Sequence, residues 1–374
     1  MKVEKLWNLN CKEPVLGIKL GDINNNGQIE AVAYTKSGKL LIISLNGTIL
    51  RQVIISQNSP IWHLEINDIN NDNKNEIIIG GLDGVLRTFK VSSTYNLTSF
   101  WNHKLGASIS GILITDVNNN SQKEIIVFSL DKTIRVLDAL NGTLVWGQVF
   151  EDGVGDALIY NDKNNQSKKE LIACGNDGTL RAFNGSNGQL LWFKIYSDKL
   201  RCLAYLDSIN GPLILCGGDD NKIHCIQINN QREIKTLDFN NYVWKCYSYP
   251  QQKFNKIIIS SYSFIFFKNT VPLQSLEFTS KLIALNEKLE VLWDLININV
   301  EFLDVIEMCN KLFILAGTTK GEVLIIDELT GKIINRVKNE ILTNMVQFHL
   351  KQRLILSCHN DGGIFAYKLE DIID

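Results

Sequence analysis

Four loops in the first half of the chain carry acidic and amide side chains at a spacing suited to calcium. Each loop spans nine residues, opens with Asp, closes with Glu and is rich in Asn between them. Calcium takes about six to eight oxygen ligands, which alternate residues of a tight loop can supply. Positions one, three, five and nine of the first three loops are therefore candidate ligands: Asp22, Asn24, Asn26 and Glu30; Asp68, Asn70, Asp72 and Glu76; Asp116, Asn118, Asn120 and Glu124.

The charges of these loops predict weak binding. Calcium affinity falls with the number of charged ligands. Loops one and three carry two carboxylates each, loop two adds Asp72, and the fourth loop, residues 162–170, has Gln166 at position five. We therefore expect weak calcium binding in the first three loops and little in the fourth. The alternative is that the Asp and Asn side chains only accept hydrogen bonds from nearby backbone N–H groups and stiffen the loops as Asx turns.

The spacing of the loops indicates the elements that position them. Successive loops are 46, 48 and 46 residues apart, which is typical of a repeat architecture. After each Glu comes a short apolar run, then a turn and a third strand such as residues 133–137. A second turn, which contains Gly47, Gly142 or Gly188 in three of these repeats, leads to a fourth strand. The apolar runs do not alternate with polar residues, as expected of strands buried on both faces. Each repeat is thus predicted to be a sheet of four antiparallel strands.

The same order of strands and turns continues through the second half of the chain and predicts eight such sheets. First strands are expected to begin near Leu16, Trp62, Ser110, Gly155, Cys202, Trp244, Phe302 and Met345. The last unit, residues 344–369, lacks a fourth strand, while residues 4–10 precede the first unit without a partner. Because radial sheets that close on themselves leave no open edge, we predict an all-β, eight-bladed β-propeller over residues 1–374, with seven blades as the fallback and the N-terminal strand completing the last blade.

Two family resemblances accompany this pattern. The hairpin ends at residues 138–146 and 184–192 resemble the Gly-x-x-x-Trp signature of the pyrroloquinoline-quinone (PQQ)-type repeat, and Trp7, Trp101 and Trp293 occupy the same strand position. The Asp-to-Glu loops resemble the FG-GAP loops of integrin α-subunit propellers and of their intracellular relatives. Those relatives include propellers of Bardet-Biedl syndrome proteins and of lysosomal nutrient-signalling scaffolds. The resemblances imply a propeller fold and leave the function open.

Three arginines recur at the repeat period inside third strands, at positions that also match the intracellular FG-GAP propellers: Arg87, Arg135 and Arg181. A charge at a recurring, partly buried position needs a partner. One set of candidate partners is the acidic residues four positions earlier: Asp83, Asp131 and Asp177. The other set is the Glu residues that close the loops. We expect structural ion pairs in these blades, since a position repeated in every blade does not define one site.

Composition narrows the function classes. The net charge of -2 gives no basic surface for nucleic acid or an anionic membrane. The N-terminus has no apolar run typical of a signal peptide, and no segment reaches membrane-spanning length, so a cytoplasmic protein is expected.

The eight cysteines form no Cys-x-x-Cys pair and are interpreted as small buried hydrophobes, and the five histidines lack metal-ligand spacing.

Residues 262–281 make the sixth unit about a dozen residues longer than its neighbours. The excess is rich in aromatic side chains, so it either folds back onto the propeller or presents an apolar patch to a partner. The candidate partner-binding residues are Phe264, Phe266, Phe267, Leu273 and Phe278.

These observations favour a non-enzymatic scaffold that binds protein partners, as a monomeric propeller within a larger intracellular assembly. One alternative is a PQQ-dependent dehydrogenase, although such enzymes are longer, exported and use adjacent cysteines that this chain lacks. The other is a cell-envelope scaffold similar to the eight-bladed outer-membrane assembly lipoprotein, which would need a signal peptide and a lipidated cysteine.

Overall fold

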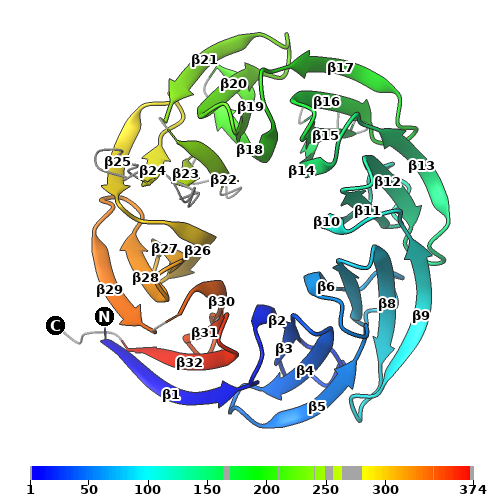
Figure 1. The fold of residues 1–374 in the computed structure, drawn as a ribbon, viewed down its shortest axis with the longest axis vertical. Helices are drawn as coiled ribbons and strands as arrows, with labels where there is room; N and C mark the ends of the chain where they lie inside the picture. The colour runs from blue at the N-terminus through cyan, green and yellow to red at the C-terminus, as the bar shows by residue number, and fades with distance from the viewer. Residues whose placement is uncertain are drawn as a thin grey trace, which may run out of the picture.

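The computed structural model describes residues 2–162, 169–208, 210–239, 241–248, 256–262, 280–339 and 341–370. The described residues form thirty-two strands in eight sheets of four, and none of them lies in a helix. The sheets surround a central axis as the blades of a ring, with the first strand of each blade innermost and the fourth at the rim (Figure 1). The predicted eight-bladed β-propeller is confirmed, and the seven-bladed fallback is not needed.

From the centre outwards, the first four blades are β2 (Val15–Gly21), β3 (Glu30–Thr35), β4 (Lys39–Ser44) and β5 (Ile49–Ile54); β6 (Ile61–Asn67), β7 (Glu76–Gly81), β8 (Val85–Val91) and β9 (Leu97–Lys104); β10 (Ile109–Thr115), β11 (Glu124–Ser129), β12 (Thr133–Asp138) and β13 (Leu144–Val149); β14 (Val154–Asn161), β15 (Lys169–Gly175), β16 (Thr179–Asn184) and β17 (Leu190–Ile195).

The other four blades are β18 (Leu200–Ser208), β19 (Gly211–Gly218), β20 (Lys222–Gln227) and β21 (Glu233–Asp238); β22 (Tyr242–Ser248), β23 (Ile257–Tyr262), β24 (Lys281–Leu285) and β25 (Val291–Ile296); β26 (Val300–Met308), β27 (Lys311–Thr318), β28 (Glu322–Asp327) and β29 (Ile333–Lys338); β30 (Thr343–His349), β31 (Leu354–His359), β32 (Gly363–Glu370) and β1 (Lys2–Asn10).

The N-terminal strand closes the ring. β1 pairs antiparallel with β32, from Lys2 opposite Glu370 to Asn10 opposite Gly363, and becomes the outer strand of blade eight (Figure 1). The strand starts two residues before the predicted residue 4. Its closure joins the two ends of the chain in one sheet, so that the last blade is not left with three strands.

The burial of the strands follows their place in the blade. Second strands such as β3, β7 and β11 are buried along their whole length, because strands flank them on both sides and neighbouring blades cover both faces. Outer strands are mostly exposed; β13 and β17 each have one buried residue, Trp146 and Trp192. The core lies between adjacent blades: one apolar cluster joins Val136 of blade three to Leu171 of blade four.

Tryptophans of the outer strands fasten one blade to the next. The indole Nε1 of Trp146 donates to the carbonyl of Gly185 in the following blade at 2.8 Å, and its ring lies against Gly188. A Cβ at Gly188 would fall 2.4 Å from that ring, and its φ of +71° also favours glycine. The same contact recurs from Trp7 to Leu45, from Trp101 to Ala139 and from Trp293 to Glu328.

Of the aromatic insertion predicted at 262–281, residues 263–279 lie outside the described residues. This includes all five candidate partner-binding side chains: Phe264, Phe266, Phe267, Leu273 and Phe278. The described strands that flank it, β23 and β24, pair with each other in the regular pattern of the other blades. Within the described residues, no helix has the length and apolar character needed to span a membrane.

Candidate functional site

The three predicted calcium loops share one hydrogen-bonding geometry. In the third loop, the backbone N–H of Asn120 donates to Asp116 Oδ1 at 3.2 Å and to Asn118 Oδ1 at 3.0 Å. The other oxygen of Asp116 accepts from Ser121 N at 2.9 Å, and Asn120 Oδ1 accepts from Gln122 N. Equivalent bonds hold the loops that open with Asp22 and Asp68. The side-chain oxygens of positions one and three therefore converge on the position-five amide.

The Glu at position nine is turned inward instead. Glu124 is 3% exposed; its Oε2 accepts from Val117 N at 2.8 Å and its Oε1 from Asn118 Nδ2 at 2.6 Å. Glu30 and Glu76 accept the corresponding backbone N–H groups. Burial raises the pKa of all three carboxyls above the ordinary value. These residues hold the start of each loop against its second strand, which is a structural role.

Neighbouring loops are also tied to one another, a feature that the sequence analysis missed. The residue at position eight reaches back to the opening carbonyl of the preceding loop: Asn75 Nδ2 donates to Asp22 O at 2.9 Å, and Lys123 Nζ to Asp68 O at 2.6 Å. Lys169 Nζ makes the same contact with Asp116 O. The only feature of the sequence that could have indicated these contacts is the side-chain donor, Asn or Lys, at position eight of loops two to four. Four consecutive loops are thereby linked along one arc of the ring.

The loops fit a cation only in part. Each accepting oxygen keeps a second lone pair, so the oxygens at positions one, three and five could still face an ion. The Glu residues, however, are committed to backbone and amide donors. Among the described residues, His, Cys, Asp and Glu form no group of three or more arranged to hold a metal ion. Of the fourth loop, residues 163–168 lie outside the described residues.

The recurring arginines form the predicted ion pairs with the acidic residues four positions earlier. Nitrogen–oxygen distances are 2.6 Å for Arg87 with Asp83, 3.2 Å for Arg135 with Asp131 and 3.0 Å for Arg181 with Asp177. The loop Glu residues, which were the other candidate partners, are engaged elsewhere. The pairs lie at the turn between the second and third strands of blades two to four, so they are structural elements of the repeat.

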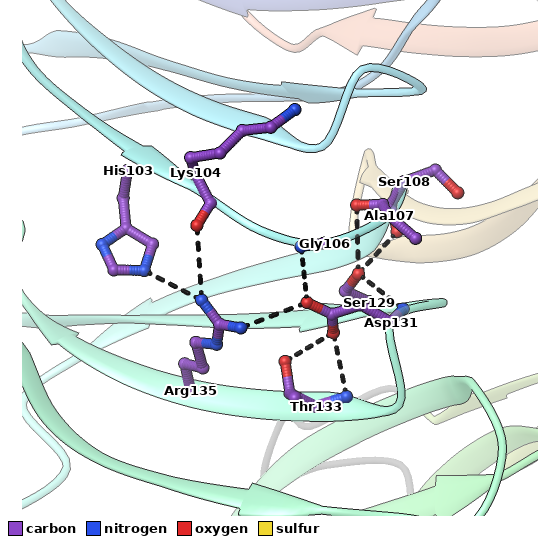
Figure 2. A network of polar contacts seen from close by, with 9 residues as sticks. All are labelled: His103, Lys104, Gly106, Ala107, Ser108, Ser129, Asp131, Thr133 and Arg135. Carbon is purple, nitrogen blue, oxygen red and sulfur yellow. Dashed lines mark hydrogen bonds and ion pairs between the residues drawn. The ribbon is translucent and has the colours of Figure 1, made fainter.

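Figure 2 shows how one of these pairs connects blades two and three. Asp131 Oδ2 accepts from Gly106 N at 2.8 Å, and Arg135 also contacts His103 Nε2 at 3.2 Å and the carbonyl of Lys104 at 3.4 Å. Burial alone would raise the pKa of Asp131, but hydrogen bonds, first among them that from Thr133, together with the charge of Arg135 hold it below the ordinary value. The carboxylate stays ionised and ties the end of β9 to the next blade.

Blade five replaces the arginine with a histidine. His224 Nε2 lies 2.7 Å from Asp220, four residues earlier, and Nδ1 lies 3.1 Å from Glu233. Burial acts to lower the pKa of His224, but the hydrogen bonds and charges of Asp220 and Glu233 outweigh it and raise that pKa above the ordinary value. The ring of Tyr196 packs against the imidazole at a tilt of 37°, with ring centroids 4.0 Å apart. The blade therefore contains a proton-dependent version of the ion pair.

We predict that this histidine makes stability depend on pH near neutrality. A raised folded-state pKa stabilises the protein below the unfolded value of about 6.5, and this contribution is lost as the pH rises through the folded value. Above neutral pH, the melting temperature of the native protein should fall by a few degrees relative to His224→Arg, which keeps the charge. Thermal melts of both proteins from pH 6 to pH 9 measure this difference. Parallel melting curves across that range would contradict it.

The inner strands line a channel cavity of about 580 Å³. Each inner strand has a register shift near its start. The residue that resumes the pairing after the shift occupies the equivalent position in all eight blades; these residues are Gly17, His63, Gly111, Asp156, Cys202, Lys245, Phe302 and Met345. Several of these side chains bond to the next blade; Asp156 Oδ2 accepts from Leu203 N at 2.9 Å. Burial raises the pKa of Asp156 to about 6 and lowers that of His63 to about 4.

The rim of blades three and four is apolar. On β13, Leu144, Val145 and Val149 are 56%, 45% and 66% exposed. On the neighbouring outer strand β17, the exposed apolar side chains are Leu190, Phe193 and Ile195. Among the eight outer strands, all of which the structure describes, β13 is the one without a charged residue. The sequence analysis did not single out this rim, because its residues read simply as fourth strands.

Eight radial sheets of four strands define the chain as an eight-bladed β-propeller. Among solved structures it is similar to Sqt1 of Saccharomyces cerevisiae, at 11% identity and a TM-score of 0.76, covering 99% of this chain and all of that one. It is also similar to BamB from Moraxella catarrhalis, at 15% identity and a TM-score of 0.67, and to the computationally designed Ika8 protein, at 16% and 0.70. Both matches cover 98% of this chain and all of the other. At these identities the likeness concerns the fold alone.

No family model matches the sequence. No curated protein matches it either.

Proposed function

We propose that the chain is a non-enzymatic scaffold that binds a protein partner at the rim of blades three and four. The observation that carries this proposal is the uncharged outer strand β13, whose side chains Leu144, Val145 and Val149 are exposed. Outer strands are sheet edges with unpaired backbone groups, and soluble proteins usually protect such edges with charges, particularly lysine. An edge that lacks this protection is suited to pair with another strand.

The occupant we propose is an extended, apolar segment of a partner protein that adds a fifth strand to blade three. Backbone hydrogen bonds to the edge would supply affinity, and alternate side chains of the segment would contact the apolar side chains of β13. The exposed side chains Phe193 and Ile195 of β17, 56% and 70% exposed, continue the apolar surface onto blade four. The N-terminal strand β1 shows that a separate segment can complete a blade of this ring.

The test is an affinity purification from native cells with matched variants. Val145→Lys and Val149→Lys place a charge on the β13 edge, whereas Ile234→Lys places one on β21, which already carries acidic residues and is exposed at the rim of blade five. We expect at least one protein to be retained by the native chain and by Ile234→Lys but lost, by tenfold or more, from both β13 variants. Equal recovery by all four baits would contradict the proposal, as would β13-dependent self-association without another protein.

The proposal places the chain in the cytoplasm as one subunit of a larger assembly. No disulfide joins any two of its eight cysteines, and five of them are buried. Free thiols are typical of a reducing compartment. The resemblance of its loops to those of intracellular FG-GAP propellers agrees with this location. No catalytic step is assigned to the chain.

Weak calcium binding by the first three loops is a subordinate proposal, supported by the convergence of position-one and position-three oxygens in each loop. Calcium at tenfold excess over the dissociation constant should stabilise the chelator-treated protein by about 1.4 kcal/mol per occupied loop. The melting temperature should rise with calcium in the native protein, rise less in Asp68→Asn, and rise as in the native protein in Asp162→Asn, which alters the fourth loop. An unchanged melting temperature at millimolar calcium would show that the loops are Asx turns only.

A further inference from the structure

Two cysteines from adjacent blades meet beside the channel. Cys202 lies on β18, the inner strand of blade five, and Cys246 lies on β22, the inner strand of blade six. Their Sγ atoms are 3.1 Å apart, about 1 Å more than the disulfide bond length of about 2.05 Å. We propose that Cys202 and Cys246 are a redox modification site, at which peroxide oxidation forms a disulfide that cross-links blades five and six.

The position of the pair suits this reaction. Both cysteines line the channel cavity, so a small oxidant can reach them from solvent. Cys202 is 3% exposed and Cys246 is half-buried, so we take Cys246, the more exposed residue of the pair, as the one that reacts first with the oxidant. Formation of the disulfide would break only weak contacts of the Cys202 thiol, whose other contacts are 3.8 Å to Gly217 O and 3.9 Å to Val243 O.

The chemistry balances with hydrogen peroxide as the oxidant. The Cys246 thiolate attacks one peroxide oxygen, the O–O bond breaks, and the products are a sulfenic acid and, after proton transfer, one water. The Cys202 sulfur then attacks the sulfenic sulfur, the S–O bond breaks, and a second water leaves. Two electrons pass from the thiol pair to peroxide, and two thiols plus one peroxide become one disulfide and two waters. A dithiol reductant reverses the change by exchange.

Geometry makes the site selective within the chain. The Sγ of Cys202 lies against the Sγ of Cys246 on the neighbouring inner strand, so a sulfenic acid formed on Cys246 has a second sulfur in contact with it. Exposure alone would instead favour oxidation of Cys309, which is the exposed cysteine. Burial, followed by the contact with Cys202, raises the pKa of the Cys246 thiol, so only a small fraction is thiolate at neutral pH. Oxidation should therefore be slow at pH 7 and about tenfold faster for each unit of pH increase below that pKa.

The disulfide would stabilise the ring. It joins residues 44 apart in sequence, and cross-linking a segment of this length reduces the entropy of the unfolded chain. For a protein of this size we expect the melting temperature to rise by about 5 °C on oxidation. Because the bond spans two blades at the channel, the added stability should resist opening of the ring between blades five and six.

The experiment treats the purified, fully reduced chain with millimolar hydrogen peroxide at pH 8 and counts thiols in denaturant. The native protein should fall from eight thiols to six, lose about 2 Da in mass and yield one linked peptide pair that contains residues 202 and 246. Peptide mapping of the native protein requires no substitution, so the result does not depend on whether a variant folds. Recovery of all eight thiols with dithiothreitol completes the test.

Matched variants give the control. Cys202→Ser and Cys246→Ser should each form no intramolecular disulfide and show no rise in melting temperature. Cys225→Ser, which alters another buried cysteine of blade five in the same apolar cluster, should still lose two thiols. A native protein that keeps its eight thiols under these conditions, or that forms its disulfide between other cysteines, would overturn the proposal.

Discussion

Removal of residues 1–10 should destabilise the protein more than any single substitution considered above. The deletion removes β1, exposes the edge of β32 and takes away Trp7, whose indole N–H donates to Leu45 O at 2.9 Å in blade one. Loss of a packed tryptophan alone costs about 3 to 5 kcal/mol, and the loss of the pairing with β32 adds to it. We expect a fall in melting temperature of about 10 °C or more, with a tendency to self-associate through the open edge.

Two point variants separate the causes of that loss. Trp7→Ala should account for part of the destabilisation, because its ring lies against Gly47 of blade one. Leu6→Ala should have little effect, since Leu6 is 47% exposed on the same strand. Thermal melts with size-exclusion chromatography measure both quantities. A truncated chain that melts like the native one would mean that β1 does not close the ring.

The second large effect is expected from Trp146→Ala. Trp146 is 8% exposed, packs on Phe183 with ring centroids 6.2 Å apart and donates to Gly185 O, so it fastens blade three to blade four. The substitution removes the ring from an apolar cluster shared by the two blades and leaves the Gly185 carbonyl without this donor. Its expected cost is about 3 to 5 kcal/mol.

A matched control is Trp62→Ala, which removes a tryptophan that is 38% exposed and lies outside the repeat motif. It should cost much less, and Trp146→Phe should fall between the two because it keeps an aromatic ring but loses the N–H donor. Urea unfolding provides the free energies. Equal losses for Trp146→Ala and Trp62→Ala would show that the contact between blades carries no special share of the stability.

The fold could be predicted because one signal was repeated. The Asp-to-Glu loops recur at nearly constant spacing in the first four blades, and the same order of apolar strands and turns continues through the other four, so the eight blades and their closure by the N-terminal strand follow from periodicity. First strands begin within two residues of the predicted positions, as at Val15 and Thr343. The Arg–Asp ion pairs could also be predicted from the sequence, because the two partners are only four residues apart on one hairpin.

Contacts between blades could not be predicted in the same way. The Gly-x-x-x-Trp pattern places Gly142 and Trp146 in one hairpin, yet Trp146 contacts Gly188 of the next blade, and Gly142 receives Trp101 of the previous one. The approach of Cys202 to Cys246 depends likewise on how two inner strands meet at the channel. Such contacts arise from the curvature and closure of the ring, which local sequence patterns do not encode.

The central claim, that a partner strand pairs with the edge of β13, is tested most directly by amide hydrogen exchange. The chain is measured alone and again in complex with the protein that its affinity purification recovers in a β13-dependent manner. We predict that the outward-facing amides of Leu144–Val149 exchange at least tenfold more slowly in the complex, while those of β21 and β29 are unchanged. Protection confined to other parts of the ring, with β13 exchanging as in the free chain, would contradict the account.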